Sequence, residues 1–289
     1  MTTIVKIYGG LAGQMTQYAF ARYLELMKKE PVKLDISFFG QQTLNNSFRK
    51  FELLNWNTQC CIASEKDYDN VFSEVKITDK IKFRLLKKEV VNTSYFYEKT
   101  PFCFDSDVLK ANYKIYDGYW VNNEYMAQVK QLLKKEFTPR YPISVQNNEI
   151  LDKIKATNAV AIHFRRGDYV NSIHDVIKPD YYKEALAHIS QQVDKPYYFV
   201  FSDDMEYVKQ HYDFSDRVVY VDHNKGEESY WDIFLMSKCR HNIIANSGFS
   251  YWGAWLNEND GQLVVAPSSW MRTNNQIVKN LLLPGWHII

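Results

Sequence analysis

A chain of 289 residues is long enough to bury the core of one large domain or of two smaller ones. Its 35 lysines and arginines almost balance 34 aspartates and glutamates, and a net charge of +1 gives no broad attraction to nucleic acid or to an anionic membrane. Any anion that this chain binds must therefore be held by a local group of side chains, and we expect no nucleic-acid partner.

The N-terminal residues, MTTIVKIYGG, lack a basic region followed by an apolar core, and no segment reaches the roughly 18 apolar residues that cross a bilayer. We therefore expect a cytoplasmic protein with no transmembrane segment; peripheral association with the inner membrane face stays open. The cysteines show no C-x-x-C spacing, which favours reduced thiols over a metal site or a disulfide framework. They are Cys60, Cys61, Cys103 and Cys239.

The first part of the chain begins with a strand, a helix and a second strand. Residues 3–10 predict a strand that ends in two glycines, residues 14–29 an amphipathic helix, and residues 31–37 the second strand. From about residue 40 to 115 the sequence is aromatic and polar without a clear period. Within it, the segment 38–56 predicts partial helix.

A short segment with two prolines, EFTPRYPISVQNNEI, separates this part from a more regular one. Such a composition is typical of links between domains. We therefore predict an N-terminal domain at residues 1–150 and a C-terminal domain at residues 151–289.

The second part alternates between short apolar runs and segments with helical periodicity. Strands are predicted at 158–164, 196–204, 217–222, 241–247 and 262–267. Helices are predicted between them at 181–193, 205–212, 229–239 and 249–259. Because the strands are apolar throughout, both faces of their sheet must be covered, which predicts an α/β fold with a parallel sheet.

Polar residues follow three of these strands, at the edge where doubly wound sheets bind ligands. Arg165 and Arg166 follow the first strand, before Gly167 and Asp168, and the guanidinium fork of arginine matches phosphate oxygens. The run from Asn246 to Ser250 lies where a strand turns into a helix, whose N-terminus offers free N–H groups to an anion.

The third strand end carries Ser202, Asp203 and Asp204, and carboxylates accept from ribose hydroxyls or from the N–H groups of guanine. Together the three strand ends predict a site for a nucleotide diphosphate. Each group also has a structural interpretation: a salt-bridged arginine pair at the surface, serine helix caps, and a buried core position for His163.

Other motifs carry less information. The turn YGGLAGQ is rich in glycine but matches neither G-x-G-x-x-G nor the P-loop pattern. Asp105 and Asp107 have the D-x-D spacing of some metal sites, but no clear strand precedes them, and we expect no metal. The absence of H-E-x-x-H, G-x-S-x-G and the kinase motifs argues against zinc proteases, α/β-hydrolases and kinases.

Several segments, taken in order, resemble the α-1,2-fucosyltransferases of glycosyltransferase family 11, of the bacterial type. They are GGLAGQMTQYAFARYL from Gly9, YDGYWVNNEYM from Tyr116, IHFRRGDYV from Ile162, FSDDMEYV from Phe201 and WDIFLMSKCRHNIIANSGFSYWGAWLN from Trp231. The resemblance runs over nearly the full chain, and RRGD in combination with the long C-terminal block is specific.

The resemblance implies a GT-B fold, with two Rossmann-like domains facing across a cleft. The N-terminal domain would lie on the acceptor side, where Tyr119 and Trp120 help to shape it, and the C-terminal domain would bind GDP-β-L-fucose without a metal or other cofactor. Arg165 and Arg166 would face the diphosphate, with Arg166 at the leaving group. The expected donor-binding residues are Arg165, Arg166, Ser202, Asp203, Asp204, Asn246, Ser247, Gly248, Phe249, Ser250, Gly10, Gly13 and Gln14.

The resemblance further implies a galactoside 2-α-L-fucosyltransferase, which moves L-fucose with inversion to the 2-hydroxyl of a terminal β-galactoside in glycan, O-antigen or capsule synthesis. Arg166 would stabilise the negative charge that grows on the departing phosphate. Asp168 would be either the general base or a residue that orients an arginine, and His163 is a weaker candidate for the base.

This sequence departs from the family pattern at three positions. Gly13 stands where the family has asparagine, Gly248 where it has threonine, and Thr16 where it has phenylalanine. The first two departures fall on ligand-facing loops, so two alternatives stay open. These are a catalytically degenerate protein that binds a nucleotide sugar or glycan, and a fucosyltransferase of different linkage.

Overall fold

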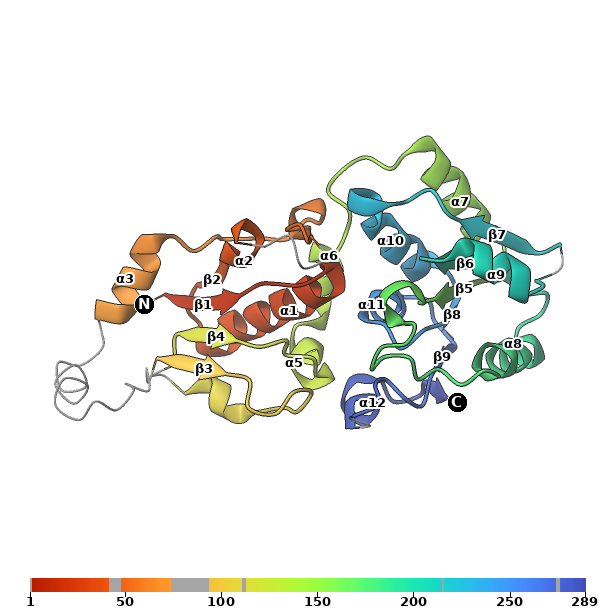
Figure 1. Cartoon of the computed structure of the whole chain (residues 1–289). Helices are drawn as coiled ribbons and strands as arrows, with labels where there is room; N and C mark the ends of the chain where they lie inside the picture. Colours follow the sequence, from red (N-terminus) through yellow and green to blue (C-terminus); the bar gives the residue numbers. More distant parts are fainter. Residues whose placement is uncertain (1, 42–47, 74–93, 111–112, 215, 274–275) are drawn as a thin grey trace. The chain divides into compact units, whose positions relative to one another are not determined.

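The computed structural model describes residues 2–41, 48–73, 94–110, 113–214, 216–273 and 276–289. The chain forms two compact units, Met1–Glu136 and Phe137–Ile289, and each is built on its own parallel sheet (Figure 1). The division lies before the predicted boundary at residue 150, because α7 (Val145–Lys155) packs against α10 (Tyr230–Lys238) of the C-terminal unit.

The N-terminal unit has a four-stranded sheet in which neighbouring strands are parallel. In sheet order its strands are β2 (Val32–Asp35), β1 (Thr3–Lys6), β4 (Ile115–Asp117) and β3 (Tyr95–Tyr97). Its helices are α1 (Leu11–Lys28), α2 (Ser37–Gly40), α3 (Glu65–Ser73), α5 (Asn123–Gln128) and α6 (Lys130–Glu136), with 3-10 turns at Leu53–Asn55 and Ser106–Leu109. The long helix α1 packs against β1, β2 and α5 and supplies much of the buried core.

The C-terminal unit has a six-stranded sheet, again with parallel neighbours. In sheet order its strands are β10 (His287–Ile288), β9 (Val264–Ala266), β8 (His241–Ile243), β5 (Ala159–Phe164), β6 (Tyr197–Ser202) and β7 (Val218–Val221). Its other helices are α8 (Tyr181–Gln192), α9 (Met205–His211), α11 (Gly248–Trp255) and α12 (Gln276–Leu281), with 3-10 turns at Gly167–Tyr169 and Gly226–Glu228.

The strand order of the C-terminal sheet reverses at its centre. From β5 the chain winds outward through β6 and β7, and it then returns to β8 and winds the other way through β9 and β10. Doubly wound sheets bind ligands at such a reversal, which here lies between β5 and β8. The prediction of an α/β chain with two Rossmann-like domains is confirmed.

The central strand β5 is buried along its whole length, because helices cover both faces of the sheet. Val160, Ile162 and Phe164 pack in a cluster with side chains of α8 and α9. His163 points to the opposite face, where its ring lies 5.6 Å from that of Phe249 in α11. Figure 1 shows α8 and α9 on one side of these strands and α10 and α11 on the other.

The predicted strands and helices of the C-terminal part are confirmed, whereas α7, α12 and β10 were not predicted. Strand β10 has two exposed residues and follows no apolar period that would mark it in the sequence. Within the segment 38–56, residues 42–47 lie outside the described residues, and the rest contains α2 and one 3-10 turn.

The packing of α10 against α11 depends on Gly253. A Cβ atom at this position would come within 2.7 Å of the Met236 Cβ, which is too close for either helix to stay in place. We expect Gly253→Ala to lower the free energy of unfolding by about 1–3 kcal/mol, measured by urea denaturation. Gly40→Ala is the control, because no atom lies within 4 Å of its added Cβ, and an equal loss in both variants would contradict the packing explanation.

Candidate functional site

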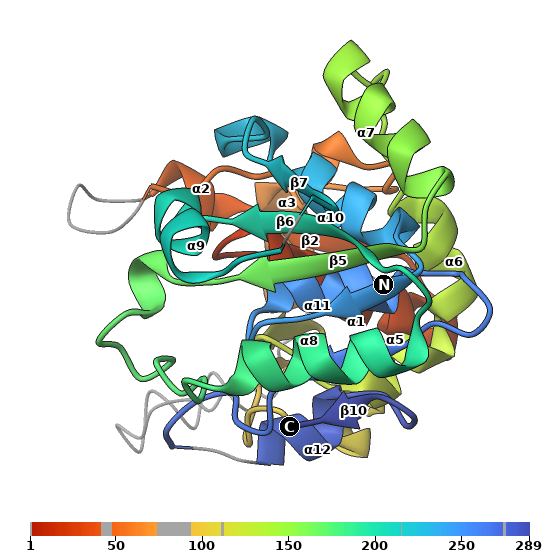
Figure 2. The same ribbon diagram turned by 90° about the vertical axis from the view of Figure 1, so that its right-hand side faces the viewer.

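The candidate site lies at the carboxyl edge of the C-terminal sheet, where β5, β6 and β8 end. Phe164 pairs with Ser202 in the register of β5 and β6, and Ile162 pairs with Ile243 in that of β5 and β8. Figure 2 shows β5 and β6 side by side, with α9 and the chain that follows β5 at the same end of both strands. All three polar strand ends that the sequence singled out therefore start from one edge.

Arg165 is held by two carboxylates. Its Nη2 lies 2.6 Å from the Asp168 Oδ1, and its Nη1 lies 3.1 Å from the Asp203 Oδ2. The guanidinium group also lies over the Tyr169 ring, 5.2 Å from the ring centroid. A quarter of the side chain remains exposed, so its outer edge stays accessible to a ligand.

Arg166 has different partners from its neighbour. Its Nε lies 3.2 Å from the Asp204 Oδ2, and its guanidinium carbon lies 3.2 Å from the centroid of the Tyr207 ring in α9. Its backbone N–H donates to the Asp203 Oδ1 at 2.8 Å. The repulsion between adjacent arginines is therefore offset by carboxylates that come from two strand ends.

Gly167 allows the Asp203 carboxylate to approach the arginine turn. A Cβ at residue 167 would lie 2.6 Å from the Asp203 Oδ2, the oxygen that pairs with Arg165. Any larger residue at this position would have to displace the carboxylate or the turn.

The turn from Ser202 to Asp204 supplies two of the carboxylates that pair with the arginines. The Ser202 Oγ accepts from the Asp204 N–H at 3.0 Å, and the Asp204 Oδ1 caps α9 by accepting from the Tyr207 N–H at 3.2 Å. The two aspartates thus pair with Arg165 and Arg166. Their expected contact with a nucleoside stays a prediction.

The turn after β8 ends in an N-cap. The Ser247 Oγ accepts from the Phe249 N–H at 3.3 Å as the cap of α11, whose first residue is Gly248. Ser250 is fully buried, and its Oγ accepts from the Ala245 N–H at 3.2 Å. The Ser250 hydroxyl therefore stabilises the conformation of the turn by a buried hydrogen bond to its backbone.

Asn246 links two further segments to this turn through side-chain hydrogen bonds. Its side-chain N–H groups donate to the His174 carbonyl at 2.8 Å and to the Trp270 carbonyl at 2.9 Å, and the residue is almost completely buried. The chain that follows the arginine pair is thereby bound to the end of β8.

His163 is a neutral imidazole. Burial, and then the nearby charge of Arg165, lower the pKa of His163 to about 3. Only 4% of the residue is exposed, and its Nδ1 has no hydrogen-bond partner. A group with this pKa is a weak base at neutral pH.

Three buried side-chain nitrogens at this edge lack a hydrogen-bond partner: His163 Nδ1, Arg165 Nε and His174 Nδ1. In the described part of the C-terminal unit, no other buried side-chain nitrogen or oxygen lacks one. An unpaired buried polar group costs about 1–3 kcal/mol, so such groups are rare and call for an explanation. All three lie on β5 or on the chain that follows it, beside the arginine pair.

Gly10, Gly13 and Gln14 belong to the N-terminal unit and lie at the start of α1. Gln14 is fully buried; its amide donates to the Gly9 and Lys50 carbonyls at 3.0 and 2.8 Å, and its carbonyl accepts from the Glu52 N–H at 2.8 Å. Gln14 therefore ties a loop to the helix. Around Gly13 an added Cβ would meet only the Tyr8 carbonyl, at 3.7 Å.

The aspartates of the D-x-D segment are engaged within the protein. The Asp105 Oδ1 accepts from the Asp107 N–H at 2.9 Å as the cap of a 3-10 turn, and both carboxylates lie within 4 Å of Lys99. Within the described residues, no group of three or more histidines, cysteines, aspartates or glutamates is arranged to hold a metal ion. No helix in the same ranges is long and apolar enough to cross a membrane.

Sequence reasoning missed Tyr169, His174 and Tyr207. Tyr169 stacks on His174 with the ring centroids 4.7 Å apart, and it lies under Arg165. Two short spacings were the available signal, since Tyr169 stands three residues after Arg166 and Tyr207 three residues after Asp204. These spacings gain meaning only once the loop and helix geometry are known.

Comparisons with known proteins agree with one another. The model of Glycosyl transferase family 11 matches residues 2–289. Alpha-1,2-colitosyltransferase of Escherichia coli is 30% identical, with 92% of this chain and 91% of that protein covered. O-antigen biosynthesis glycosyltransferase WbnK of Escherichia coli is also 30% identical, with 96% and 97% covered.

More distant similarity extends to an animal enzyme and to a solved structure. Galactoside alpha-(1,2)-fucosyltransferase 1 of Saimiri boliviensis boliviensis is 24% identical over 50% of this chain and 43% of its own. The crystal structure of fucosyltransferase NodZ from Bradyrhizobium covers 88% of this chain and 91% of its own, with 14% identity and a TM-score of 0.49.

The low pKa of His163 predicts a dependence of stability on pH. In the unfolded chain the imidazole binds a proton near pH 6.5, whereas in the folded chain it does so near pH 3. The unfolded state therefore gains protons first, and stability falls as the pH drops below 6.5. We expect His163 to account for a loss of about 1.6 kcal/mol between pH 6.5 and pH 5.

The measurement is urea unfolding of the wild type and of His163→Phe at both pH values. The other histidines are the same in both proteins, so the difference between the two pH slopes isolates His163. Equal slopes would contradict a neutral His163.

Proposed function

This chain is a glycosyltransferase that belongs to glycosyl transferase family 11, and from that premise we propose that it is an inverting α-1,2-fucosyltransferase. The donor is GDP-fucose, and the acceptor is the 2-hydroxyl of a terminal β-galactoside. The C1–O bond between fucose and the β-phosphate breaks, a bond forms between C1 and the acceptor oxygen, and the hydroxyl proton is released. GDP leaves with the electron pair of the broken bond.

One observation carries this proposal: the arginine pair lies at the reversal point of the C-terminal sheet, where carboxylates from two strand ends orient it. A diphosphate supplies acceptor oxygens that suit the guanidinium groups. The N-terminus of α11 adds the positive end of a helix dipole at the same edge. Since the net charge of the chain is only +1, this local arrangement must account for the affinity.

The reaction needs stabilisation of the leaving group more than it needs a strong base. As fucose acquires oxocarbenium character, negative charge grows on the β-phosphate, and Arg166 and Arg165 stabilise that charge. Asp168 lies 2.6 Å from the Arg165 Nη2, which supports a role in orienting this arginine. The low pKa of His163 leaves it the weaker candidate for a base. The chemistry proposed here uses no metal.

A second donor is favoured by one of the relatives. One of the two Escherichia coli relatives with 30% identity is an alpha-1,2-colitosyltransferase. Colitose is L-fucose without its 3-hydroxyl. The same diphosphate site and the same mechanism serve either sugar. A site that hydrogen-bonds the 3-hydroxyl would reject colitose strongly, because the loss of that hydroxyl leaves a buried polar group unpaired.

The first test is incubation with GDP-fucose and lactose in EDTA, with analysis of the linkage of the product. We expect GDP release and an α-1,2-linked fucosyl-lactose, formed at the same rate as in an incubation without EDTA. Loss of activity in EDTA that a divalent cation restores would contradict the metal-free mechanism. GDP binding without any product would favour a degenerate protein that binds nucleotide sugars, and another linkage would favour a fucosyltransferase of different specificity.

Because the Arg166 guanidinium group presents a planar fork of N–H donors, we predict that lysine cannot replace it. A lysine keeps the charge but loses the planar pair of donors, so Arg166→Lys should lower kcat on the order of a hundredfold, as should Arg166→Ala. Arg240→Lys is the control, because Arg240 precedes β8 at the opposite edge of the sheet. Wild-type turnover in Arg166→Lys would remove Arg166 from the mechanism.

Donor choice is tested by competition between GDP-fucose and GDP-colitose for one acceptor. We expect GDP-fucose to have the higher kcat/KM, since a polar site favours the sugar that keeps its 3-hydroxyl. A reversed ratio would assign the chain to colitosyl transfer and leave the diphosphate site as proposed.

A further inference from the structure

The two arginines of the candidate site differ in how much of their hydrogen-bonding capacity is already used. Both Nη atoms of Arg165 are paired with carboxylates, those of Asp203 and Asp168. Arg166 engages only its Nε, which lies 3.2 Å from the Asp204 Oδ2. Within the described residues, neither Nη atom of Arg166 has a hydrogen-bond or ion-pair partner. The planar fork that matches two phosphate oxygens is therefore open in Arg166.

The orientation of this fork is set by Tyr207 and Asp204. The guanidinium carbon of Arg166 lies 3.2 Å from the centroid of the Tyr207 ring, and at this distance the flat guanidinium group must lie face to face with the ring. The ring thus sets the plane of the guanidinium group, and the contact of its Nε with Asp204 limits rotation within that plane. The other carboxylate oxygen of Asp204 accepts from the Tyr207 N–H at 3.2 Å. Arg166 and the residue under it are therefore held by the same carboxylate.

His211 covers the other face of the Tyr207 ring. The two ring centroids lie 3.8 Å apart with planes 16° from parallel, and the His211 Nδ1 lies 2.8 Å from the Tyr207 carbonyl oxygen, one turn earlier in α9. Two flat groups this close to one centroid would overlap on a single face, so Arg166 and His211 lie on opposite faces. No face of the ring is left on which a base or a sugar could stack. The Tyr207 ring is therefore placed to act on Arg166 and not on a ligand.

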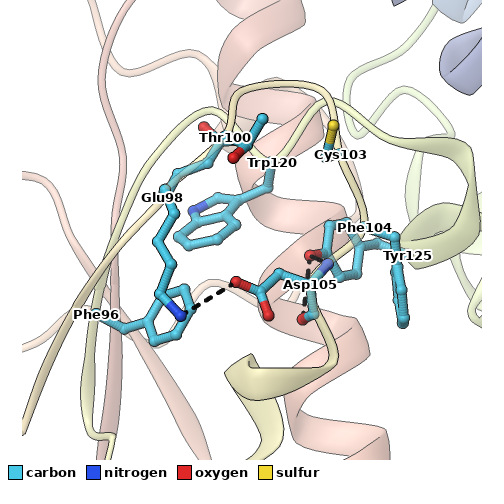
Figure 3. A pocket seen from close by; sticks show the side chains of 9 residues that line it. Phe96, Glu98, Thr100, Cys103, Phe104, Asp105, Trp120 and Tyr125 are labelled. Atoms are coloured by element: carbon cyan, nitrogen blue, oxygen red, sulfur yellow. Dashed lines mark hydrogen bonds and ion pairs between the residues drawn. The ribbon is translucent and has the colours of Figure 1, made fainter. Parts of the chain in front are cut away.

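A cation also lies over an aromatic ring at a pocket of the N-terminal unit, whose lining includes Trp120. Figure 3 shows the Phe96 ring and the Asp105 side chain at this pocket. The Lys99 ammonium group lies 5.1 Å from the Phe96 centroid. It also lies 3.6 Å from the Asp105 Oδ2 and 3.3 Å from the Asp107 Oδ2, so two carboxylates balance its charge. The stack at Arg166 differs because it leaves the terminal donors of the cation open.

We propose that Tyr207 is a positioning residue for the departure of the nucleoside diphosphate: its ring, backed by His211, holds the open fork of Arg166 toward the β-phosphate of the donor. A fork that is already oriented needs no rearrangement when negative charge grows on that phosphate, which is the condition for preorganised stabilisation of a transition state. Tyr207 acts through Arg166 and leaves the sugar and the acceptor untouched. The assignment of the β-phosphate as the leaving group rests on the proposed function.

The kinetic test compares Tyr207→Leu and Tyr207→Phe with the wild type in fucose transfer to lactose. Leucine removes the stack, so kcat should fall about 3- to 30-fold, while KM for GDP-fucose stays within about twofold. Phenylalanine keeps the ring and should restore kcat to within about twofold of the wild type. Tyr220→Leu is the matched control, since Tyr220 lies under Lys209 of the same helix, with the ammonium group 5.4 Å from the ring centroid. Full turnover in Tyr207→Leu, or an equal loss in Tyr207→Phe or in the control, would overturn the proposal.

A double-mutant cycle tests whether Tyr207 works through Arg166. Arg166→Lys removes the fork, so the further change Tyr207→Leu should leave kcat within about twofold of that of Arg166→Lys alone. If the two losses multiply instead, Tyr207 acts independently of Arg166 and the proposal fails.

A third measurement does not depend on catalysis. The free β-phosphate of GDP carries the charge that the leaving group acquires, whereas GMP lacks this phosphate. In isothermal titration we expect Tyr207→Leu to weaken GDP binding about 3- to 30-fold and to leave GMP binding within about twofold, and Tyr207→Phe to bind both as the wild type does. An equal loss for GDP and GMP would indicate general damage to the site and would overturn the proposal.

These measurements separate the role of Tyr207 from the proposed function. A selective loss of GDP affinity in Tyr207→Leu, in a protein that transfers no fucose, would support the role of Tyr207 and contradict the proposed function. Fucose transfer by the wild type, with turnover and GDP affinity unchanged in Tyr207→Leu, would overturn the role of Tyr207 and leave the proposed function intact.

Discussion

The candidate site depends on one carboxylate, that of Asp203. One of its oxygens accepts from the Arg166 backbone N–H and the other pairs with the Arg165 guanidinium, so it links the end of β6 to the turn after β5. Glycine at residue 167 leaves room for this contact, because a Cβ there would lie 2.6 Å from the Asp203 Oδ2. Without Asp203, two adjacent positive charges would stand at the centre of the sheet with less to offset them, and the turn would lose a constraint from the neighbouring strand.

The carboxylates that pair with the two arginines, those of Asp168, Asp203 and Asp204, also affect the charge of the site. They reduce the net charge at the strand ends, so the anion affinity that we propose for this site comes from the position of the donors more than from an excess of positive charge. Arginines that are already oriented lose little freedom when a ligand binds, which is the advantage of preorganisation.

Several polar side chains of the sequence motifs are buried and stabilise nearby loops by hydrogen bonds to the backbone. Gln14 joins the start of α1 to the loop at Lys50 and Glu52, Asn246 joins the end of β8 to the His174 and Trp270 segments, and Ser250 closes its own turn. Each of the three is buried with its hydrogen bonds made to the backbone. In the N-terminal unit, Glu98 does the same for the strained backbone at Phe102 and Trp120. Loops that carry binding groups are thus fixed by amide, hydroxyl and carboxyl groups underneath them.

The α/β class, the strands and most helices of the C-terminal unit, and the three polar strand ends could all be predicted from the sequence. These follow from local periodicity and from the rule that carboxyl ends of parallel strands meet at one edge. The tertiary structure alone decided what each polar residue touches. Asp203 and Asp204 meet arginines 37 and 38 residues away, and Tyr169 meets His174 through a turn of the loop. The pocket at Trp120 likewise joins segments from Phe96 to Tyr125 whose sequence shows no clear period. Hydrophobic periodicity specifies which face of an element is buried, whereas the pairing of polar groups depends on how separate loops come together in space.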